Sequence, residues 1–214
     1  MIGEMEITWL GHSCFRLRGR DATALTDPCP PSTGFKIGKV TADVVTISHD
    51  DPESSYRQAV QGDAKFVTAP GEYEIAGILI AGIPMKGSKQ APPQRNLAFV
   101  VDIDDIRVCH LGLLTAIPHT DDAEQLVGTD ILLVPVGGGG SLDARAAAEA
   151  VSMLEPKIVI PMRYKTAGAT GDLEGVEKFL KEMGAEAKAP ESRLNITKSG
   201  LPSDTTVVVL EARG

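Results

Sequence analysis

Two apolar runs on either side of a helix pattern restrict the fold of this chain more than any other segment. Residues 131–136 (ILLVPV) are continuously apolar, which is typical of a parallel strand covered on both faces. Four glycines follow, and then Ser141 and Asp143 mark a helix start, because their side-chain oxygens accept hydrogen bonds from the free N–H groups of a first turn. Pro156 ends this helix, and residues 157–160 form the next strand. This strand–loop–helix–strand order predicts an α/β fold with parallel strands.

The remainder of the sequence is rich in short strand patterns. Alternating or fully apolar runs predict strands at residues 6–10, 13–18, 21–27, 44–47, 65–68, 75–83, 97–101, 106–110 and 206–210. Other patterns predict a short helix at residues 53–60 and an amphipathic helix at residues 172–183, which Gly184 ends. The best loop candidate, residues 90–94, is too short for a domain linker, so we predict a single domain over residues 1–214.

Composition and charge argue against several classes of partner. The 214 residues are 43% hydrophobic and 23% charged, as in ordinary globular proteins, and carry a formal net charge of −8. Because nucleic-acid phosphates and anionic membranes need clustered Lys and Arg, we expect no nucleic acid and no membrane as the main partner.

The N-terminal residues lack the basic and apolar regions of a signal peptide, and the three cysteines are too widely spaced for a disulfide framework. We therefore expect a cytoplasmic protein whose partner is a small molecule or another protein, and a homo-oligomer stays open.

The segment SHDDPES at residues 48–54 has elements of a metal site. It follows a buried strand pattern at residues 42–47, and His49 is followed two and four residues later by the carboxylates of Asp51 and Glu53. Imidazole and carboxylate groups are common ligands of protein-bound metals. A lone His at a strand end is more often a polar residue with a local hydrogen bond, and an acidic loop is more often simply solvated. Both interpretations stay open at this point.

Segments along most of the chain resemble the metallo-β-lactamase superfamily. Residues 48–54 resemble its His-x-His-x-Asp-His loop, and residues 7–15 resemble the first strand of the branch that includes the ascorbate-6-phosphate lactonases. Further similar segments occur in the family's order at residues 26–28, 70–75 (a turn in that branch), 109–113, 134–138 and 160–164. The resemblance implies an αββα sandwich, which is an α/β fold with two mixed β-sheets packed face to face and helices outside.

The resemblance also implies metal chemistry. Working members of the superfamily hold one or two metal ions, usually zinc or manganese, with a hydroxide that attacks an ester, lactone, amide or phosphodiester. Matched to their loop, His49 keeps a ligand position, whereas Asp51, Glu53 and Ser54 replace a His, an Asp and a His. We expect no metal cofactor. The alternative is one divalent zinc or manganese ion bound by His49, Asp51 and Glu53.

Two other ligand positions of the family are changed more severely. Leu113 stands in place of the bridging Asp, and Arg163 stands in place of the final His in a segment that otherwise reads Pro-Met-His-Tyr. Neither side chain can bind a metal ion, and a guanidinium would repel one. The family's middle His falls near residues 85–87, where this chain has no His.

Several more residues are expected to line the family's pocket. We interpret His12 and His110 as structural neighbours of the site rather than as ligands. Asp27 either faces the metal region, as a carboxylate of the family does, or caps the turn that follows it. Gly137 and Gly138 are expected in a flexible rim loop, or alternatively in an anion cradle at the next helix N-terminus.

The residues predict a family member that has lost its metal centre and binds or scaffolds an unidentified ligand. One alternative is a metal-dependent hydrolase of an ester, lactone or phosphoester with a single-ion site. Another is a metal-free hydrolase in which His49 acts as general base on water and Arg163 holds an anionic group. We further expect Arg163 to form a bidentate salt bridge with Asp27, Asp51 or Glu53.

Overall fold

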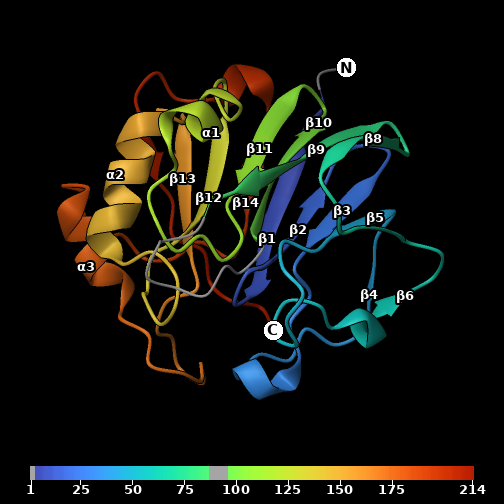
Figure 1. The fold of residues 1–214 in the computed structure, drawn as a ribbon, viewed down its shortest axis with the longest axis horizontal. Coiled ribbons are helices and arrows are strands. Elements are labelled where there is room, and N and C mark those ends of the chain that lie inside the picture. Colours follow the sequence, from blue (N-terminus) through green and yellow to red (C-terminus); the bar gives the residue numbers. More distant parts are fainter. Residues whose placement is uncertain (1–2, 87–95) are drawn as a thin grey trace.

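Two large mixed β-sheets pack face to face in the computed structural model, which describes residues 3–86 and 96–214 (Figure 1). The first sheet has the order β14-β1-β2-β3-β5-β7, and the second has the order β15-β13-β12-β11-β10-β9-β8. The strands of the first sheet are β1 (Met5–Gly11), β2 (Cys14–Arg18), β3 (Thr23–Thr26), β5 (Val44–Thr46), β7 (Lys65–Val67) and β14 (Leu194–Ile196). Those of the second are β8 (Gly71–Ile75), β9 (Ile78–Met85), β10 (Asn96–Ile103), β11 (Ile106–His110), β12 (Ile131–Pro135), β13 (Ile158–Met162) and β15 (Thr206–Val207). The predicted sandwich of two mixed sheets is confirmed.

The outer layer of the seven-stranded sheet is helical. The α-helices α1 (Thr120–Glu124), α2 (Ala144–Leu154) and α3 (Val176–Glu182) lie on its side of the molecule (Figure 1). Helix α2 connects the parallel strands β12 and β13, so the predicted strand–loop–helix–strand unit is present. Its N-terminus is capped by Asp143, whose side chain accepts a hydrogen bond from the N–H of Ala146.

Strand alternation divides the six-stranded sheet into two apolar faces. Trp9 and Phe15 belong to the main core between the sheets, whereas their chain neighbours Leu10 and Cys14 belong to a second core on the outer face. That second core includes the loop residue Phe35 and is packed against by the short strands β4 (Val40–Thr41) and β6 (Val60–Gln61). The 3-10 helices η1 (Pro31–Thr33) and η2 (Arg57–Ala59) lie in the same part of the chain. The outer layer of this sheet is therefore built from loops and short elements.

Some predicted elements differ from the observed ones. The pattern at residues 75–83 is not one strand, because the chain reverses at Ala76 and Gly77 to form the antiparallel pair β8–β9. For the same reason, residues 70–75, which resemble a turn, lie mostly in strand β8. The predicted helix at residues 53–60 is only the single turn η2, and the predicted strand at residues 206–210 is only β15 followed by an isolated bridge at Leu210. A further 3-10 turn, η3 (Lys198–Gly200), was not predicted.

Tertiary hydrogen bonds shorten the C-terminal amphipathic helix. Helix α3 begins at Val176, not at residue 172, because Glu174 is held elsewhere: its N–H donates to Gly137 and its carbonyl accepts from Lys165. The predicted loop at residues 90–94 lies outside the described residues. The longest described helix, α2, has 11 residues, and no described helix is long and apolar enough to cross a membrane.

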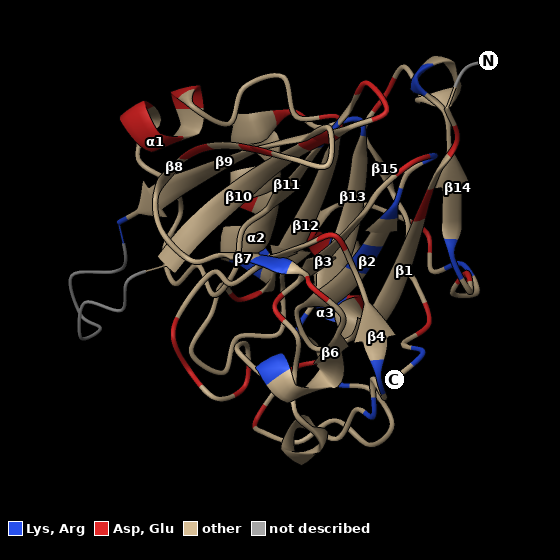
Figure 2. Ribbon diagram, turned by 90° about the vertical axis from the view of Figure 1, so that its right-hand side faces the viewer, with Lys and Arg blue, Asp and Glu red and all other residues tan. Residues whose placement is uncertain are grey.

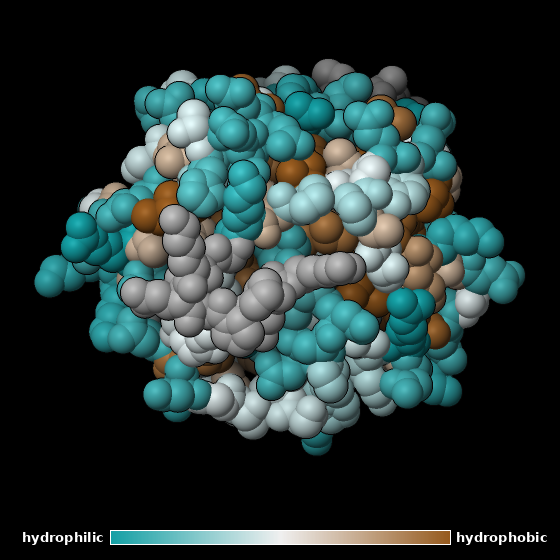
Figure 3. All heavy atoms as spheres, viewed as in Figure 1, coloured by the Kyte–Doolittle hydropathy of each residue, from teal (hydrophilic) through white to brown (hydrophobic). Residues whose placement is uncertain are grey.

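The described surface is mixed in charge and largely hydrophilic. Basic and acidic residues are scattered over the ribbon in Figure 2, many of them in loops. The face in Figure 3 is mostly hydrophilic, with small apolar areas between polar side chains. Leu79, Val127 and Met153 are the exposed large apolar side chains of the described chain.

Candidate functional site

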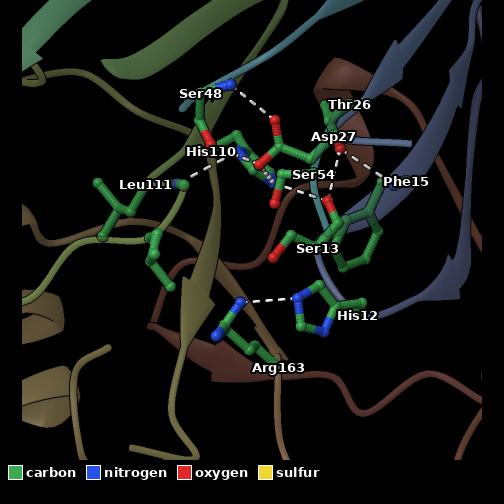
Figure 4. A network of polar contacts seen from close by, with 12 residues as sticks. His12, Ser13, Phe15, Thr26, Asp27, Ser48, Ser54, His110, Leu111 and Arg163 are labelled. Carbon is green, nitrogen blue, oxygen red and sulfur yellow. Dashed lines mark hydrogen bonds and ion pairs between the residues drawn. The ribbon is translucent and has the colours of Figure 1, made fainter. Parts of the chain in front are cut away.

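The candidate site lies where strands of both sheets end. His12 follows β1, Asp27 follows β3, His110 ends β11 and Arg163 follows β13. The loop after β5 adds His49 and the acidic residues beyond it. Because the carboxyl ends of these strands meet at one edge of the sandwich, side chains distant in sequence come together there (Figure 4).

A continuous chain of polar contacts runs from Asp27 to Asp51. Ser48 donates its backbone N–H to Asp27 Oδ1 at 2.7 Å and its hydroxyl to Asp27 Oδ2 at 2.5 Å. The Ser48 hydroxyl also lies 2.8 Å from His49 Nδ1, and His49 Nε2 lies 2.8 Å from Asp51 Oδ2. Ser54 Oγ is a further neighbour of His49 Nε2, at 3.1 Å. Both ring nitrogens of His49 are thus occupied, Nδ1 by the Ser48 hydroxyl and Nε2 by the Asp51 carboxylate and the Ser54 hydroxyl.

Asp51 also organises its own loop. Its Oδ1 accepts hydrogen bonds from the backbone N–H groups of Glu53 at 2.7 Å and Ser54 at 3.0 Å. Burial by itself raises the pKa of this carboxyl, but the hydrogen bond and charge of His49 and the two N–H donors outweigh burial, so the pKa of Asp51 lies below its ordinary value. Asp51 is therefore an ionised carboxylate at neutral pH.

Arg163 forms the second polar group of the site, with His12 and Glu53. Its Nη1 donates to His12 Nε2 at 2.6 Å (Figure 4). Its Nη2 lies 3.7 Å from Glu53 Oε2. The expected salt bridge is therefore present with Glu53. It is not bidentate, because the other guanidinium nitrogen is used by His12. The buried Nε of Arg163 has no hydrogen-bond partner among the described residues.

His12 is neutral in this arrangement. Burial, and after it the positive charge of Arg163, lower the pKa of His12 to about 3. A neutral imidazole has a lone pair on one ring nitrogen, so His12 Nε2 accepts the Arg163 hydrogen bond. Glu53 Oε2 lies 3.5 Å from the same nitrogen.

His110 is also neutral and fully engaged. Its Nε2 donates to the carbonyl of Ser13 at 2.9 Å, and its Nδ1 accepts the N–H of Gly112 at 3.2 Å. Burial lowers its pKa, while the charge of Asp27, 4.0 Å away, acts in the opposite direction. These contacts hold β11 against the β1–β2 turn.

The remaining predicted pocket residues have structural contacts. Leu113 is buried, and its N–H donates to the side chain of Asn96 at 2.8 Å. A Cβ on Gly137 would lie 2.3 Å from the carbonyl oxygen of Arg163, so glycine permits the close approach of the two backbones. Gly138 closes a turn, since its N–H donates to Leu142. With α2 capped by Asp143, this loop does not present a free helix N-terminus to an anion.

Ser48 and Arg57 are site residues that sequence reasoning missed. Ser48, His49, Asp50 and Arg57 line a cavity of about 400 Å³, together with Ile47, Thr68, Ala69, Pro70 and Leu97. Arg163 is not among its lining residues. The position of Ser48 directly before His49 was the only available signal. Arg57 gave none, because its place depends on the turn η2 and on its contact with the Phe66 ring, 4.6 Å from the guanidinium carbon.

The donors present do not fit a metal ion. Among the described residues, no three His, Cys, Asp or Glu side chains are grouped as a metal site requires, and the undescribed residues contain none of these types. His49 and Asp51 bind one another, while Glu53 is directed to His12 and Arg163 instead of joining them. The expected alternative of a single ion held by His49, Asp51 and Glu53 is therefore not assembled in this structure.

The fold and the strand-end site agree with sequence comparison. A profile of the beta-lactamase superfamily domain matches residues 6–163. The chain belongs to the beta-lactamase superfamily. Within it, a UPF0173 metal-dependent hydrolase of Hyperthermus butylicus is 30% identical over 219 residues, covering 85% of this chain and 93% of the relative. A UPF0173 protein of Pyrococcus furiosus is 28% identical over 200 residues, covering 84% and 90%.

A solved structure is also similar to this chain over most of its length. It is the structure of a Thermotoga maritima protein of the metallo-beta-lactamase superfamily, which is described as a proposed zinc-dependent hydrolase. Its sequence is 34% identical to this chain, and the TM-score between the two structures is 0.80. The alignment covers 96% of this chain and 98% of that protein. This superfamily member therefore belongs to the UPF0173 family of hydrolase-like proteins, and the predicted resemblance to the superfamily is confirmed.

Proposed function

We propose that this protein is a hydrolase of small esters or lactones that works without a metal centre. Membership of a family with metal-dependent hydrolases supports hydrolysis, and the occupied donors argue against a metal ion in this chain. The observation that carries the proposal is the sequence of contacts Ser48–His49–Asp51, with 2.8 Å on each side of the imidazole, at the wall of a cavity.

These contacts match the roles of a nucleophile, a base and an orienting carboxylate. Asp51 holds the Nε2–H of His49, which leaves Nδ1 to accept the proton of the Ser48 hydroxyl as its oxygen bonds to a substrate carbonyl carbon. His49 then gives that proton to the departing alkoxide. A water molecule, deprotonated by His49, next attacks the acyl-serine and releases the acid, and Ser48 regains its proton.

Asp27 positions Ser48, because its Oδ1 accepts the Ser48 backbone N–H and its Oδ2 accepts the Ser48 hydroxyl. For Ser48 to attack, its O–H turns from Asp27 to Nδ1 of His49, which lies 2.8 Å from the Ser48 oxygen. Arg57 at the cavity wall favours substrates with a carboxylate or phosphate substituent.

Hydrolysis of p-nitrophenyl butyrate and of an aliphatic lactone, in buffer with EDTA, tests this function. Changing Ser48→Ala or His49→Ala is expected to lower kcat/KM by about 100-fold or more, as loss of an acid–base group does. His119→Ala is the matched control, because His119 is exposed and far along the chain. A fluorophosphonate probe is expected to label Ser48 in the unchanged protein but not in His49→Ala. Activity that survives both site variants, or that EDTA removes and zinc restores, contradicts the proposal.

One observation favours a second candidate, a non-catalytic binding member. Ser48 is 1% exposed, and its hydroxyl is already held by Asp27. In that case the cavity binds an anionic small molecule at Arg57 and does not turn it over. Saturable binding of an ester or its acid product, with no turnover and no fluorophosphonate labelling, distinguishes this candidate from the first.

A further inference from the structure

The second polar group of the site, Arg163 with His12 and Glu53, has no role in the proposed hydrolysis. Arg163 is 7% exposed, so its charge is buried beside the acidic residues of the neighbouring loop. Burial lowers its pKa, while attraction to Glu53, Asp51 and Asp27 raises it. Glu53 lies 3.7 Å from the guanidinium, and the charges of Asp51 and Asp27 also act on this group, which stays protonated in proteins.

The donor atoms of Asp27, Asp51 and His12 already have partners. The two carboxylate oxygens of Asp27 accept from Ser48, and those of Asp51 accept from His49 and from two backbone N–H groups. The lone pair of His12 accepts from Arg163. A metal ion would compete with these partners, and it would also meet the guanidinium charge.

The backbone holds Arg163 in place. Its N–H donates to the carbonyl of His12 at 3.2 Å, so backbone and side chain both contact the same residue. Gly137 packs against its carbonyl, where any side chain would collide. These contacts fix the backbone of Arg163 between the residue after β1 and the loop after β12, and the hydrogen bond to His12 Nε2 holds its side chain.

We propose that Arg163 is the resident cation of this site and that its guanidinium, beside His12 and Glu53, excludes divalent metal ions from the pocket. The negative charge that metal ions would otherwise balance is neutralised from within the chain. Because Arg163 supplies this positive charge, the protein holds no metal ion at the site, although its family includes metal-dependent hydrolases. The inference does not depend on hydrolysis, because it concerns which cation occupies the site.

The geometry offers a direct way to reverse the exclusion. His12 Nε2 and Glu53 Oε2 are 3.5 Å apart, close enough for both to contact one ion once the guanidinium is gone. Arg163→His removes the fixed charge and adds a third donor. Arg163→Met removes the charge without adding a donor, and Arg163→Lys keeps a charge. Arg163→His combined with Glu53→Gln removes one donor of the new site.

The experiment measures zinc and manganese in protein purified without a metal-affinity tag, and then titrates each ion calorimetrically. The unchanged protein and Arg163→Lys are expected to hold no stoichiometric metal and to show no saturable binding. Arg163→His is expected to bind one zinc ion per chain at least about tenfold more tightly than Arg163→Met, because a third converging donor is present. Adding Glu53→Gln is expected to abolish that gain.

Two results overturn the inference. One is stoichiometric metal in the unchanged protein that is lost in His49→Ala. The other is an Arg163→His variant, folded by circular dichroism, that binds zinc no better than the unchanged protein. If Arg163→His does not fold, the metal content of the unchanged protein still decides. Metal-free protein without ester hydrolysis would contradict only the proposed function.

Discussion

Three residues of the site occupy the left-handed backbone region although none is glycine. His12, Asp27 and Arg163 have φ values of 52°, 36° and 53°, each directly after a strand. Such a conformation costs roughly 1–3 kcal/mol and persists only where surrounding contacts enforce it. Here the N–H of Asp27 donates to Thr46 and that of Arg163 donates to His12. The chain gives up stability to place these three side chains at the strand-end site.

The neutral state of His12 predicts how stability depends on pH. The pKa of His12 falls from 6.5 to about 3 on folding, so the unfolded chain binds more protons between those values. Stability contributed by His12 is therefore complete above about pH 6.5 and is lost as the pH falls toward 3. In His12→Gln the amide oxygen still accepts from Arg163. Urea unfolding of this variant is expected to show a free energy of unfolding that falls less steeply with decreasing pH than in the unchanged protein, by up to about 1.4 kcal/mol per pH unit. An unchanged slope in this variant contradicts the assignment.

The sequence predicted which residues lie at the site better than it predicted the contacts between them. The sequence placed His49 and Arg163 in the site by their positions in similar segments, and the salt bridge of Arg163 with an acidic residue was predicted. The contacts of Ser48 could not be predicted. Its partners are Asp27, which follows β3, and its chain neighbour His49, and both contacts depend on where strands end. The bidentate geometry predicted for that salt bridge was wrong, because His12 also contacts the guanidinium.

At the scale of elements, the loop after β5 is held by local hydrogen bonds. Asp51 accepts from two backbone N–H groups through its side chain and from the Ser55 hydroxyl through its carbonyl. An Asx turn of this kind fixes the loop without a metal ion. The same carboxylate thus shapes the loop and orients His49, which is why an Asp here has a role independent of ligand binding.

The N-terminal cap of α2 provides a prediction for a single element. Asp143 Oδ1 accepts from the N–H of Ala146 at 2.8 Å, and the helix follows the glycine loop that packs on Arg163. Asp143→Ala is expected to lower the free energy of unfolding by about 1 kcal/mol, whereas Asp143→Asn, which keeps the acceptor, is expected to lose much less. Thermal melts of the two variants measure the difference, and equal melting temperatures contradict the capping role.

Element boundaries were predictable where local signals decide them and not where tertiary contacts do. Helix α2 has its cap and its proline stop in the sequence, and it forms as predicted. Helix α3 has a longer apolar pattern, but Glu174 forms hydrogen bonds with Gly137 and Lys165 instead of starting the helix. The reversal between β8 and β9 was missed because Ala76, which has φ of 52°, carries no turn signal of its own.

At the scale of the molecule, the central strands determine stability. Leu133 lies in β12, between the parallel neighbours β11 and β13, and is 0% exposed. Leu133→Ala is expected to lower the free energy of unfolding by about 2–5 kcal/mol, since it removes buried methyl groups and leaves a cavity. Leu79→Ala, at a side chain 51% exposed, is expected to change it by less than about 0.5 kcal/mol. Urea unfolding of both variants measures the contrast, and similar losses contradict this placement of the core.

The sequence by itself determined the α/β class and the parallel unit around α2, because apolar periodicity, the helix cap and the proline stop are local properties. The sandwich was implied by the resemblance to known family members. Only the tertiary structure decided how the surviving polar groups pair. Whether Glu53 joins His49 or turns to Arg163, and whether His12 is charged, depends on distances of a few ångströms between strand ends and on burial. Those quantities arise when the two sheets pack.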